Sequence, residues 1–176
     1  MANRIIICGM NCSGKSTLGK ALSEETGWTF RDAEDYFFPQ RAVDQPYDTA
    51  RTKAEAANLL LKDLKAHDDF IFASVRGDYG DAAAALFTCA VLITVPKQIR
   101  TQRIWDRSYQ KFGDRILPGG DLHDCEKHFF DMASARPESH VTEWLDSIRL
   151  PVIRIDGTLP APQNAGIILQ ELAKLR

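Results

Sequence analysis

The feature that most constrains this chain is a glycine-rich turn near its N-terminus, placed directly after a short apolar run. Residues 5–8 are wholly apolar and rich in isoleucine, which predicts a strand buried on both faces of a parallel sheet. Gly9 ends that run, and apolar residues then recur at helical spacing between Gly14 and Gly27. The segment therefore predicts a strand, a tight turn and a helix.

The turn matches the pattern of a phosphate-binding loop, G-x-x-x-x-G-K-[ST], at every fixed position. Its glycines let successive backbone N–H groups face inward, and the following helix directs a partial positive charge at the same point. We expect Lys15 to reach the outer phosphates of ATP and Ser16 to offer its hydroxyl to Mg²⁺. The residues expected to bind Mg-ATP here are Gly9, Asn11, Cys12, Ser13, Gly14, Lys15, Ser16 and Thr17.

Strand and helix patterns alternate along the rest of the chain. Four more strands are predicted at 28–31, 70–75, 89–95 and 151–155. A helical segment is predicted to start at residue 46 and to end at Asp68 and Asp69. Further helices are predicted at 81–87, at 97–112, around 122–132, at 137–148 and around 165–172. This alternation predicts an α/β fold with a parallel sheet of about five strands, helices on both faces, and a ligand crevice at the strands' carboxyl ends.

Composition narrows the class of protein. The chain has 176 residues, 44% of them hydrophobic, which predicts a single domain over residues 1–176. The 22 Lys and Arg nearly balance 24 Asp and Glu, so we expect no binding to nucleic acid or to an anionic membrane. The four cysteines form no dense spacing pattern, and no apolar run reaches transmembrane length, so we expect a cytoplasmic protein.

Acidic residues follow the second predicted strand. The third strand, by contrast, ends at Ser74 without the carboxylate that holds magnesium in many ATPases and GTPases. The run Phe-Arg-Asp-Ala-Glu at 30–34, with Asp35 beside it, resembles the small-molecule and nucleoside monophosphate kinases of the P-loop class, especially shikimate and gluconate kinases. Those kinases carry a D-x-D motif at this place, and here Glu34 stands in place of the second Asp. The resemblance implies a three-layer P-loop fold.

The resemblance also implies roles for these acids. Asp32 is expected to assist Mg²⁺ and to accept or position the proton of the acceptor hydroxyl, with Glu34 and Asp35 in support. An acidic loop that is merely solvated is the alternative.

Three arginines follow the fourth strand at spacings of three and four, which places Arg100, Arg103 and Arg107 on one side of the predicted helix. Arg115 lies beyond them. This arrangement resembles the lid-bearing helix of the same kinases, which implies a lid at about 108–122 and a catalytic role for Arg107 and Arg115 on the ATP phosphates. A solvated basic helix face is the alternative.

Two further strand ends fit the resemblance. After the third strand it implies that Arg76 contacts an anion and Asp78 a hydroxyl of the acceptor, with an acceptor-binding segment at about 36–66. After the last strand, Asp156 resembles the loop that borders adenine, although a plain turn explains it equally well.

These observations predict transfer of the γ-phosphoryl group from Mg-ATP to a small-molecule or nucleotide acceptor. A nucleotide-binding protein or slow ATPase that acts through a partner is the alternative, and an interaction module that ATP merely stabilises is a third. The sequence does not name the acceptor.

Overall fold

A computed structural model describes residues 2–38 and 50–175, which fold around one parallel sheet. Within these ranges the strand order is β2-β3-β1-β4-β5, and every neighbouring pair is parallel. The strands are β1 Arg4–Cys8, β2 Thr29–Asp32, β3 Phe70–Ala73, β4 Cys89–Thr94 and β5 Val152–Asp156. The predicted five-stranded parallel sheet is therefore confirmed.

Burial of both faces explains why the central strands are continuous apolar runs. Ile5, Ile6 and Ile7 in β1 are all fully buried. Because side chains alternate along a strand, Ile5 and Ile7 join the core on one face of the sheet, whereas Ile6 and Cys8 join the core on the other.

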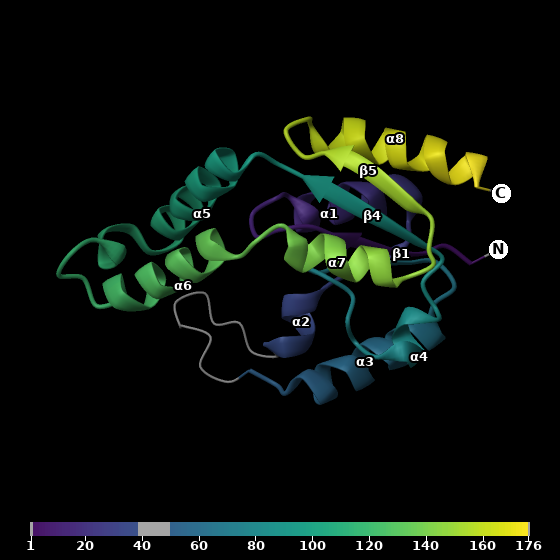
Figure 1. Ribbon diagram of the computed structural model, residues 1–176, viewed down its shortest axis with the longest axis horizontal. Helices are drawn as coiled ribbons and strands as arrows, with labels where there is room; N and C mark the ends of the chain where they lie inside the picture. The colour runs from purple at the N-terminus through teal and green to yellow at the C-terminus, as the bar shows by residue number, and fades with distance from the viewer. Residues whose placement is uncertain (1, 39–49, 176) are drawn as a thin grey trace.

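Helices cover the two faces and complete three layers (Figure 1). One face carries α1 Lys15–Thr26 and α8 Ala161–Lys174, which contact each other. The other face carries α3 Lys53–Ala66, α4 Asp81–Ala84 and α7 Ser139–Ser147. A short helix, α2 Ala33–Phe37, directly follows β2. The predicted three-layer α/β architecture is thus present.

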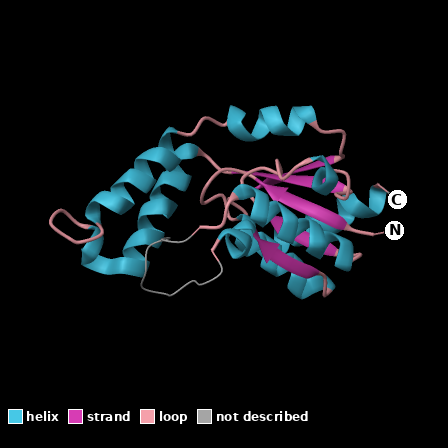
Figure 2. Ribbon diagram, turned by 90° about the horizontal axis from the view of Figure 1, so that it is seen from below, coloured by secondary structure: helices cyan, strands magenta, loops and turns pink. Residues whose placement is uncertain are grey.

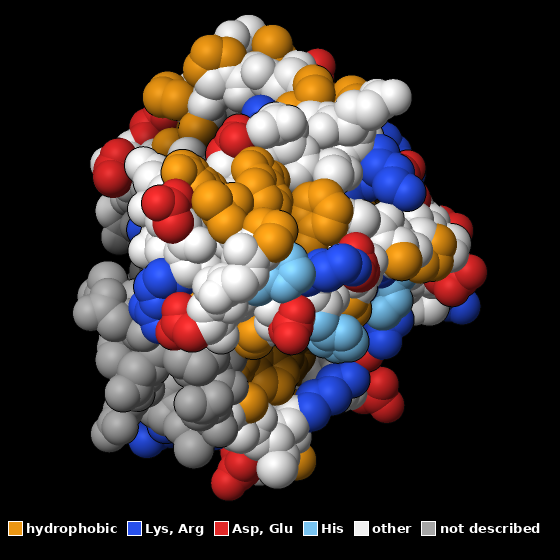
Figure 3. Space-filling model, turned by 90° about the vertical axis from the view of Figure 1, so that its left-hand side faces the viewer, with side chains coloured by type: hydrophobic (Ala, Val, Ile, Leu, Met, Phe, Trp, Pro, Cys, Tyr) orange, Lys and Arg blue, Asp and Glu red, His pale blue; other side chains and the backbone are white. Residues whose placement is uncertain are grey.

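The remaining helices form a hairpin beyond the carboxyl ends of the strands (Figures 1 and 2). It consists of α5 Lys97–Phe112, the 3₁₀ turn η1 Gly113–Ile116 and α6 His123–Ala135. Ser108 Oγ in α5 donates a 2.6 Å hydrogen bond to Glu126 in α6, which joins the two arms. Seen from the hairpin end, the surface shows hydrophobic side chains gathered among charged ones (Figure 3).

Some predicted boundaries need correction. A helix was predicted from residue 46, and in the described residues it begins at Lys53, because Thr52 and Glu55 form a capping box there. Residues 39–49 lie outside the described ranges and include part of the predicted acceptor segment. The helix predicted at 81–87 ends at Ala84. None of the helices in the described ranges is long and apolar enough to cross a membrane.

Candidate active site

The phosphate-binding loop joins β1 to α1 in the predicted position. Gly14 is the N-cap of α1 and has a left-handed backbone (φ 96°), while a Cβ on Gly9 would lie only 2.5 Å from the Ile93 carbonyl oxygen. Among the described residues no side-chain hydrogen bond caps the N-terminus of α1, and its first turn contains no acid. The start of the helix therefore leaves room and positive potential for an anion.

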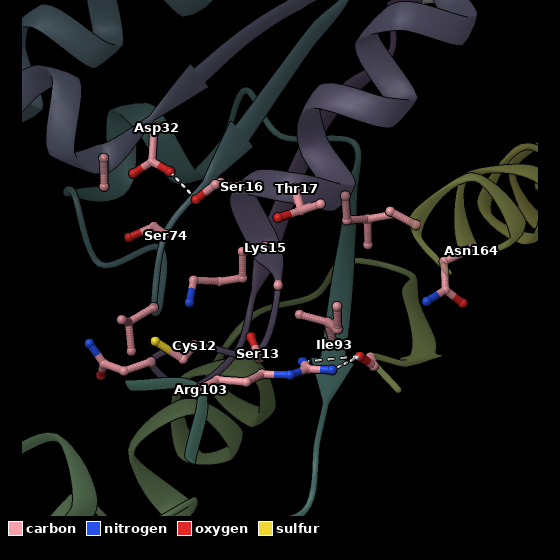
Figure 4. Close-up of a pocket in the computed structure, with 18 of the residues that line it drawn as sticks. Cys12, Ser13, Lys15, Ser16, Thr17, Asp32, Ser74, Ile93, Arg103 and Asn164 are labelled. Atoms are coloured by element: carbon pink, nitrogen blue, oxygen red, sulfur yellow. Dashed lines mark hydrogen bonds between the residues drawn. The ribbon is translucent and has the colours of Figure 1, made fainter. Parts of the chain in front are cut away.

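Lys15 lies in this loop with its ammonium directed into the cavity (Figure 4). Its Nζ donates a 2.8 Å hydrogen bond to the Met10 carbonyl oxygen. Burial is the main cause that lowers the pKa of Lys15 to about 8; the carboxylate of Asp32 opposes this shift, and the positive charge of Arg107 contributes to it. Lys15 is thus a desolvated cation that a phosphate group would stabilise.

The side chains of Ser16 and Asp32 contact each other near Lys15 (Figure 4). Ser16 Oγ donates a short hydrogen bond to Asp32 Oδ2. Asp32 is the last residue of β2 and also the N-cap of α2, where its Oδ1 accepts a 3.0 Å hydrogen bond from the Glu34 amide. The two residues predicted to hold Mg²⁺ are therefore in contact, although 16 positions separate them in the chain.

The three neighbouring acids occupy different places. Asp35 Oδ2 accepts a 3.0 Å hydrogen bond from the Asp32 amide and completes the capping box of α2. Asp35 therefore orients the backbone of Asp32, whereas Glu34 lines the cavity beside it. The alternative of an acidic loop does not describe this segment, because Asp32 ends β2 and both Glu34 and Asp35 lie in α2.

A cavity of about 420 Å³ extends from this corner. The predicted site residues in its wall are Asn11, Cys12, Ser13, Gly14, Lys15, Ser16, Thr17, Asp32, Glu34 and Arg107. The predicted residues outside its wall are Gly9, Asp35, Arg76, Asp78, Arg115 and Asp156.

The far end of the cavity is formed where α5 meets the loop after β5. Arg103 lines the cavity and donates from Nη1 and Nη2, each at 3.2 Å, to the Gly157 carbonyl oxygen. Asn164 Nδ2 donates a 2.8 Å hydrogen bond to the Asp156 carbonyl oxygen. Asn164 was not predicted from the sequence. A polar residue on the buried, apolar side of α8, next to Ala165, could have indicated it.

The four arginines of the α5 region separate into distinct roles. Arg103 and Arg107 line the cavity. Arg100 is buried and donates from Nε to the Val95 carbonyl oxygen at 3.0 Å. Arg115 forms an exposed pair with Asp121, with its Nη2 2.7 Å from Oδ2, so this structure does not bring Arg115 to the cavity.

Arg136 is a candidate that sequence reasoning missed. It follows the last turn of α6, and its Nη1 donates a 2.9 Å hydrogen bond to Asn11 Oδ1 in the phosphate-binding loop. The two residues are 125 positions apart, and no local periodicity indicates their contact.

The residues predicted to contact the acceptor lie on the segment after β3. Asp78 Oδ2 is 2.9 Å from Arg76 Nη2 and 2.7 Å from Lys53 Nζ in α3. Burial alone raises the pKa of Asp78, but these two cations outweigh it and hold the pKa below its usual value. Asp78 therefore orients Arg76.

Solved structures with this fold include kinases. A gluconokinase from Sinorhizobium meliloti 1021 is similar with a TM-score of 0.58 at 14% identity, covering 99% of this chain and 93% of its own. Shikimate kinase from Aquifex aeolicus vf5 is similar with a TM-score of 0.52 at 20% identity, covering 97% and 96%. The predicted P-loop kinase fold is confirmed by these likenesses.

Sequence comparison gives two further findings. The chain is 26% identical over 181 residues to an uncharacterized protein, YqaC, of Bacillus subtilis (strain 168), with 98% of this chain and 99% of that protein covered. The family model described as an AAA domain matches residues 5–127. Together with the phosphate-binding loop between β1 and α1, this match shows that the chain belongs to the AAA domain family.

Proposed function

We propose that this protein is a kinase that transfers the γ-phosphoryl group of Mg-ATP to a hydroxyl group of a small molecule. The observation that supports this most is the contact between Ser16 and Asp32, which joins the phosphate-binding loop to a carboxylate on a neighbouring strand. A carboxylate placed there borders both the nucleotide phosphates and any acceptor that approaches from the α2 side of the cavity.

The residues at this corner fit magnesium. Hydroxyl and carboxylate oxygens are its preferred protein ligands, and a site with one or two of them leaves the remaining positions to water and phosphate oxygens. Ser16 and Asp32 would hold the ion, which when bound neutralises negative charge on the phosphate oxygens.

The side chains around the cavity suit phosphoryl transfer by position and charge. Lys15 and Arg107 would offset negative charge on the transferred group. Asp32 would accept the acceptor's proton through Oδ2, the oxygen that Ser16 contacts here, while the Glu34 amide keeps Oδ1 in place. Arg103, held on the Gly157 carbonyl oxygen, would border the nucleotide base.

Arg76 and Arg136 would recognise a negative group on the acceptor. Arg136 touches the phosphate-binding loop through Asn11, and Asp78 orients Arg76. Guanidinium groups bind carboxylates and phosphates through paired N–H donors, so one at the phosphate-binding loop and one on the segment after β3 favour an anionic acceptor.

A screen of ADP release across small-molecule acceptors tests this function. We expect release that depends on one class of acceptor, and loss of that release by about 100-fold or more in Lys15→Ala, because the charge stabilisation of the transferred group is removed. Asp32→Asn should lower turnover strongly and leave ATP affinity nearly unchanged.

Two results would contradict the kinase. A slow release that no acceptor changes would favour hydrolysis of ATP, and unchanged ATP binding in Lys15→Ala would remove the phosphate-binding loop from the site. Circular dichroism of each variant separates loss of function from loss of fold.

A further inference from the structure

Ser74 and Tyr79 form a hydrogen-bonded pair at the edge of the nucleotide cavity. Ser74 directly follows β3, and Tyr79 lies five positions later on the same segment. The Ser74 Oγ and Tyr79 Oη atoms are 3.0 Å apart. Ser74 lies in the cavity wall together with Asp32 and Lys15 (Figure 4), whereas Tyr79 does not. A tyrosine hydroxyl outside the wall is therefore joined to a serine hydroxyl within it.

The backbone of Ser74 is held beside the phosphate-binding loop. Its amide donates a 3.0 Å hydrogen bond to the Ile7 carbonyl oxygen in β1. The Gly9 amide, at the start of the loop, donates at 3.2 Å to the Val75 carbonyl oxygen. Ser74 is only 6% exposed. Its backbone is thus fixed relative to the loop, and the direction of its hydroxyl depends on its hydrogen-bond partner.

Aromatic packing fixes the Tyr79 hydroxyl in turn. The Tyr79 ring meets Phe72 edge-on, with centroids 5.3 Å apart and planes at 78°, and its centroid lies 6.3 Å from that of Phe37. Burial is the main cause that raises the pKa of Tyr79; the bond to Ser74 opposes this shift, and the carboxylate of Asp78 contributes to it. Tyr79 therefore keeps its proton at neutral pH.

The two hydroxyls differ in strength as hydrogen-bond donors. A phenol is a stronger acid than an alcohol, so the Tyr79 hydroxyl donates and Ser74 Oγ accepts. Among the described residues no other side chain bonds to the Ser74 hydroxyl. The Ser74 proton is then free to point into the cavity that Lys15 and Asp32 border. A phosphate oxygen placed there would accept a charge-assisted hydrogen bond from it.

We propose that Tyr79 is a positioning residue, which holds the Ser74 hydroxyl so that Ser74 donates a hydrogen bond to the γ-phosphoryl group of bound Mg-ATP. This role gives a reason why β3 is followed by a serine and not by a carboxylate. Asp32 already places an acid in the cavity wall, and a second acid would repel the phosphates, whereas a neutral donor attracts them. The assignment rests on the proposed function for the nucleotide, and it adds a pair of residues that distinguishes ATP from ADP.

Nucleotide affinity tests this role without an acceptor. Calorimetry gives the dissociation constants of Mg-ADP and of a non-hydrolysable Mg-ATP analogue. Tyr79→Phe keeps the ring that packs on Phe72 and removes only the hydroxyl. It should weaken binding of the analogue by about threefold to tenfold and change binding of Mg-ADP by less than about twofold, because only the analogue carries a γ-phosphoryl group.

A double-mutant cycle shows whether Tyr79 acts through Ser74. Ser74→Ala should weaken binding of the analogue by about tenfold, since the donor itself is lost. Adding Tyr79→Phe to Ser74→Ala should cause no further loss, because the group that Tyr79 positions is already absent. A further loss as large as that of Tyr79→Phe alone would overturn the proposal, since Tyr79 would then act independently of Ser74.

Tyr36→Phe is the matched control. The Tyr36 ring is buried and also meets Phe72 edge-on, with centroids 5.9 Å apart. Its hydroxyl, however, donates at 2.8 Å to Asp63, which is not in the cavity wall. Both tyrosine variants should lower the midpoint of chemical denaturation, but only Tyr79→Phe should change the ratio of the two nucleotide affinities. The same ratio in both variants would reduce Tyr79 to a packing role.

Turnover separates this proposal from the proposed kinase function. In acceptor-dependent ADP release, Tyr79→Phe should raise the KM of ATP by about the factor seen for the analogue and leave the KM of the acceptor unchanged. An unchanged KM of ATP together with an unchanged affinity ratio would refute the role of Tyr79 and leave the kinase standing. A changed affinity ratio without release for any acceptor would sustain the role of Tyr79 and contradict the kinase.

Discussion

At the scale of single residues, the site depends on groups whose surroundings alter their chemistry. Lys15 is charged in water at neutral pH, but burial in the phosphate-binding loop brings its pKa to about 8. Asp32 shares its two oxygens between Ser16 and the Glu34 amide, so its position is set before any ligand binds. The sequence shows which residue types are present, but it does not show that Asp32 contacts Ser16 and the Glu34 amide.

The lowered pKa of Lys15 predicts a pH dependence of nucleotide binding. Above about pH 8 the free protein holds Lys15 neutral, so ATP binding must take up a proton. The affinity for Mg-ATP should therefore fall by up to about tenfold per pH unit above that point. Isothermal titration calorimetry between pH 7 and 9.5 in buffers of different ionisation enthalpy measures both the affinity and the proton uptake.

The same shift predicts a change in stability. Between about pH 8 and 10.5 the unfolded chain binds more protons at Lys15 than the folded protein does. The free energy of unfolding without nucleotide should therefore gain a contribution from Lys15 that rises with pH across this window. Lys15→Met should remove that contribution, while Lys20→Met, an exposed change on the same helix, should retain it. Identical profiles for native protein and Lys15→Met would contradict the assignment.

At the scale of elements, most helices and strands were predictable because their apolar periodicity is strong. The β1 strand and the α1 and α8 helices lie where the pattern placed them. Boundaries differed where a capping interaction decides them, as Thr52 does at the start of α3. The short α2 helix had no periodic signal, since five residues are too few to show one.

Two helical glycines make a matched pair for a stability test. A Cβ on Gly19 in α1 would lie 2.3 Å from Phe30 Cε2, whereas a Cβ on Gly166 in α8 would meet nothing within 4 Å. Gly19→Ala should destabilise the protein by about 1–3 kcal/mol through overpacking against β2. Gly166→Ala should stabilise it by roughly 0.5–1 kcal/mol through helix propensity.

Chemical denaturation measures both changes. Helix propensity alone predicts a gain at either position, so the opposite signs isolate the contact between Gly19 and the Phe30 ring. An equal gain in the two variants would show that α1 does not pack this closely on β2.

At the scale of the whole molecule, the α5–α6 hairpin extends beyond the sheet. Its α5 helix contributes Arg103 and Arg107 to the wall of the cavity beside the phosphate-binding loop. Its base is anchored at both ends, because the buried Arg100 donates to the Val95 carbonyl oxygen and, at 3.3 Å, to Glu138 before α7. The tip, residues 113–122, is farthest from this anchor. This arrangement suits the predicted lid at about 108–122, with a fixed base and a movable tip.

Limited trypsin digestion tests the lid. Mg-ATP should slow cleavage at Lys111 and Arg115 several-fold, because the proposed contacts of the nucleotide with Arg103 and Arg107 would hold the hairpin closed more of the time. Lys15→Ala should show no protection by Mg-ATP. Equal digestion of the native protein with and without saturating Mg-ATP would count against a lid that closes on the nucleotide.

The sequence by itself determined the phosphate-binding loop and the order of strands and helices. Both depend on residues adjacent in the chain, whose types restrict local backbone geometry and burial. Only the tertiary structure decided which distant side chains reach that loop: Asp32 meets Ser16, Arg103 lines the cavity and Arg115 does not, and Arg136 contacts Asn11. Strand register and helix packing set those meetings, and no spacing along the chain encodes them.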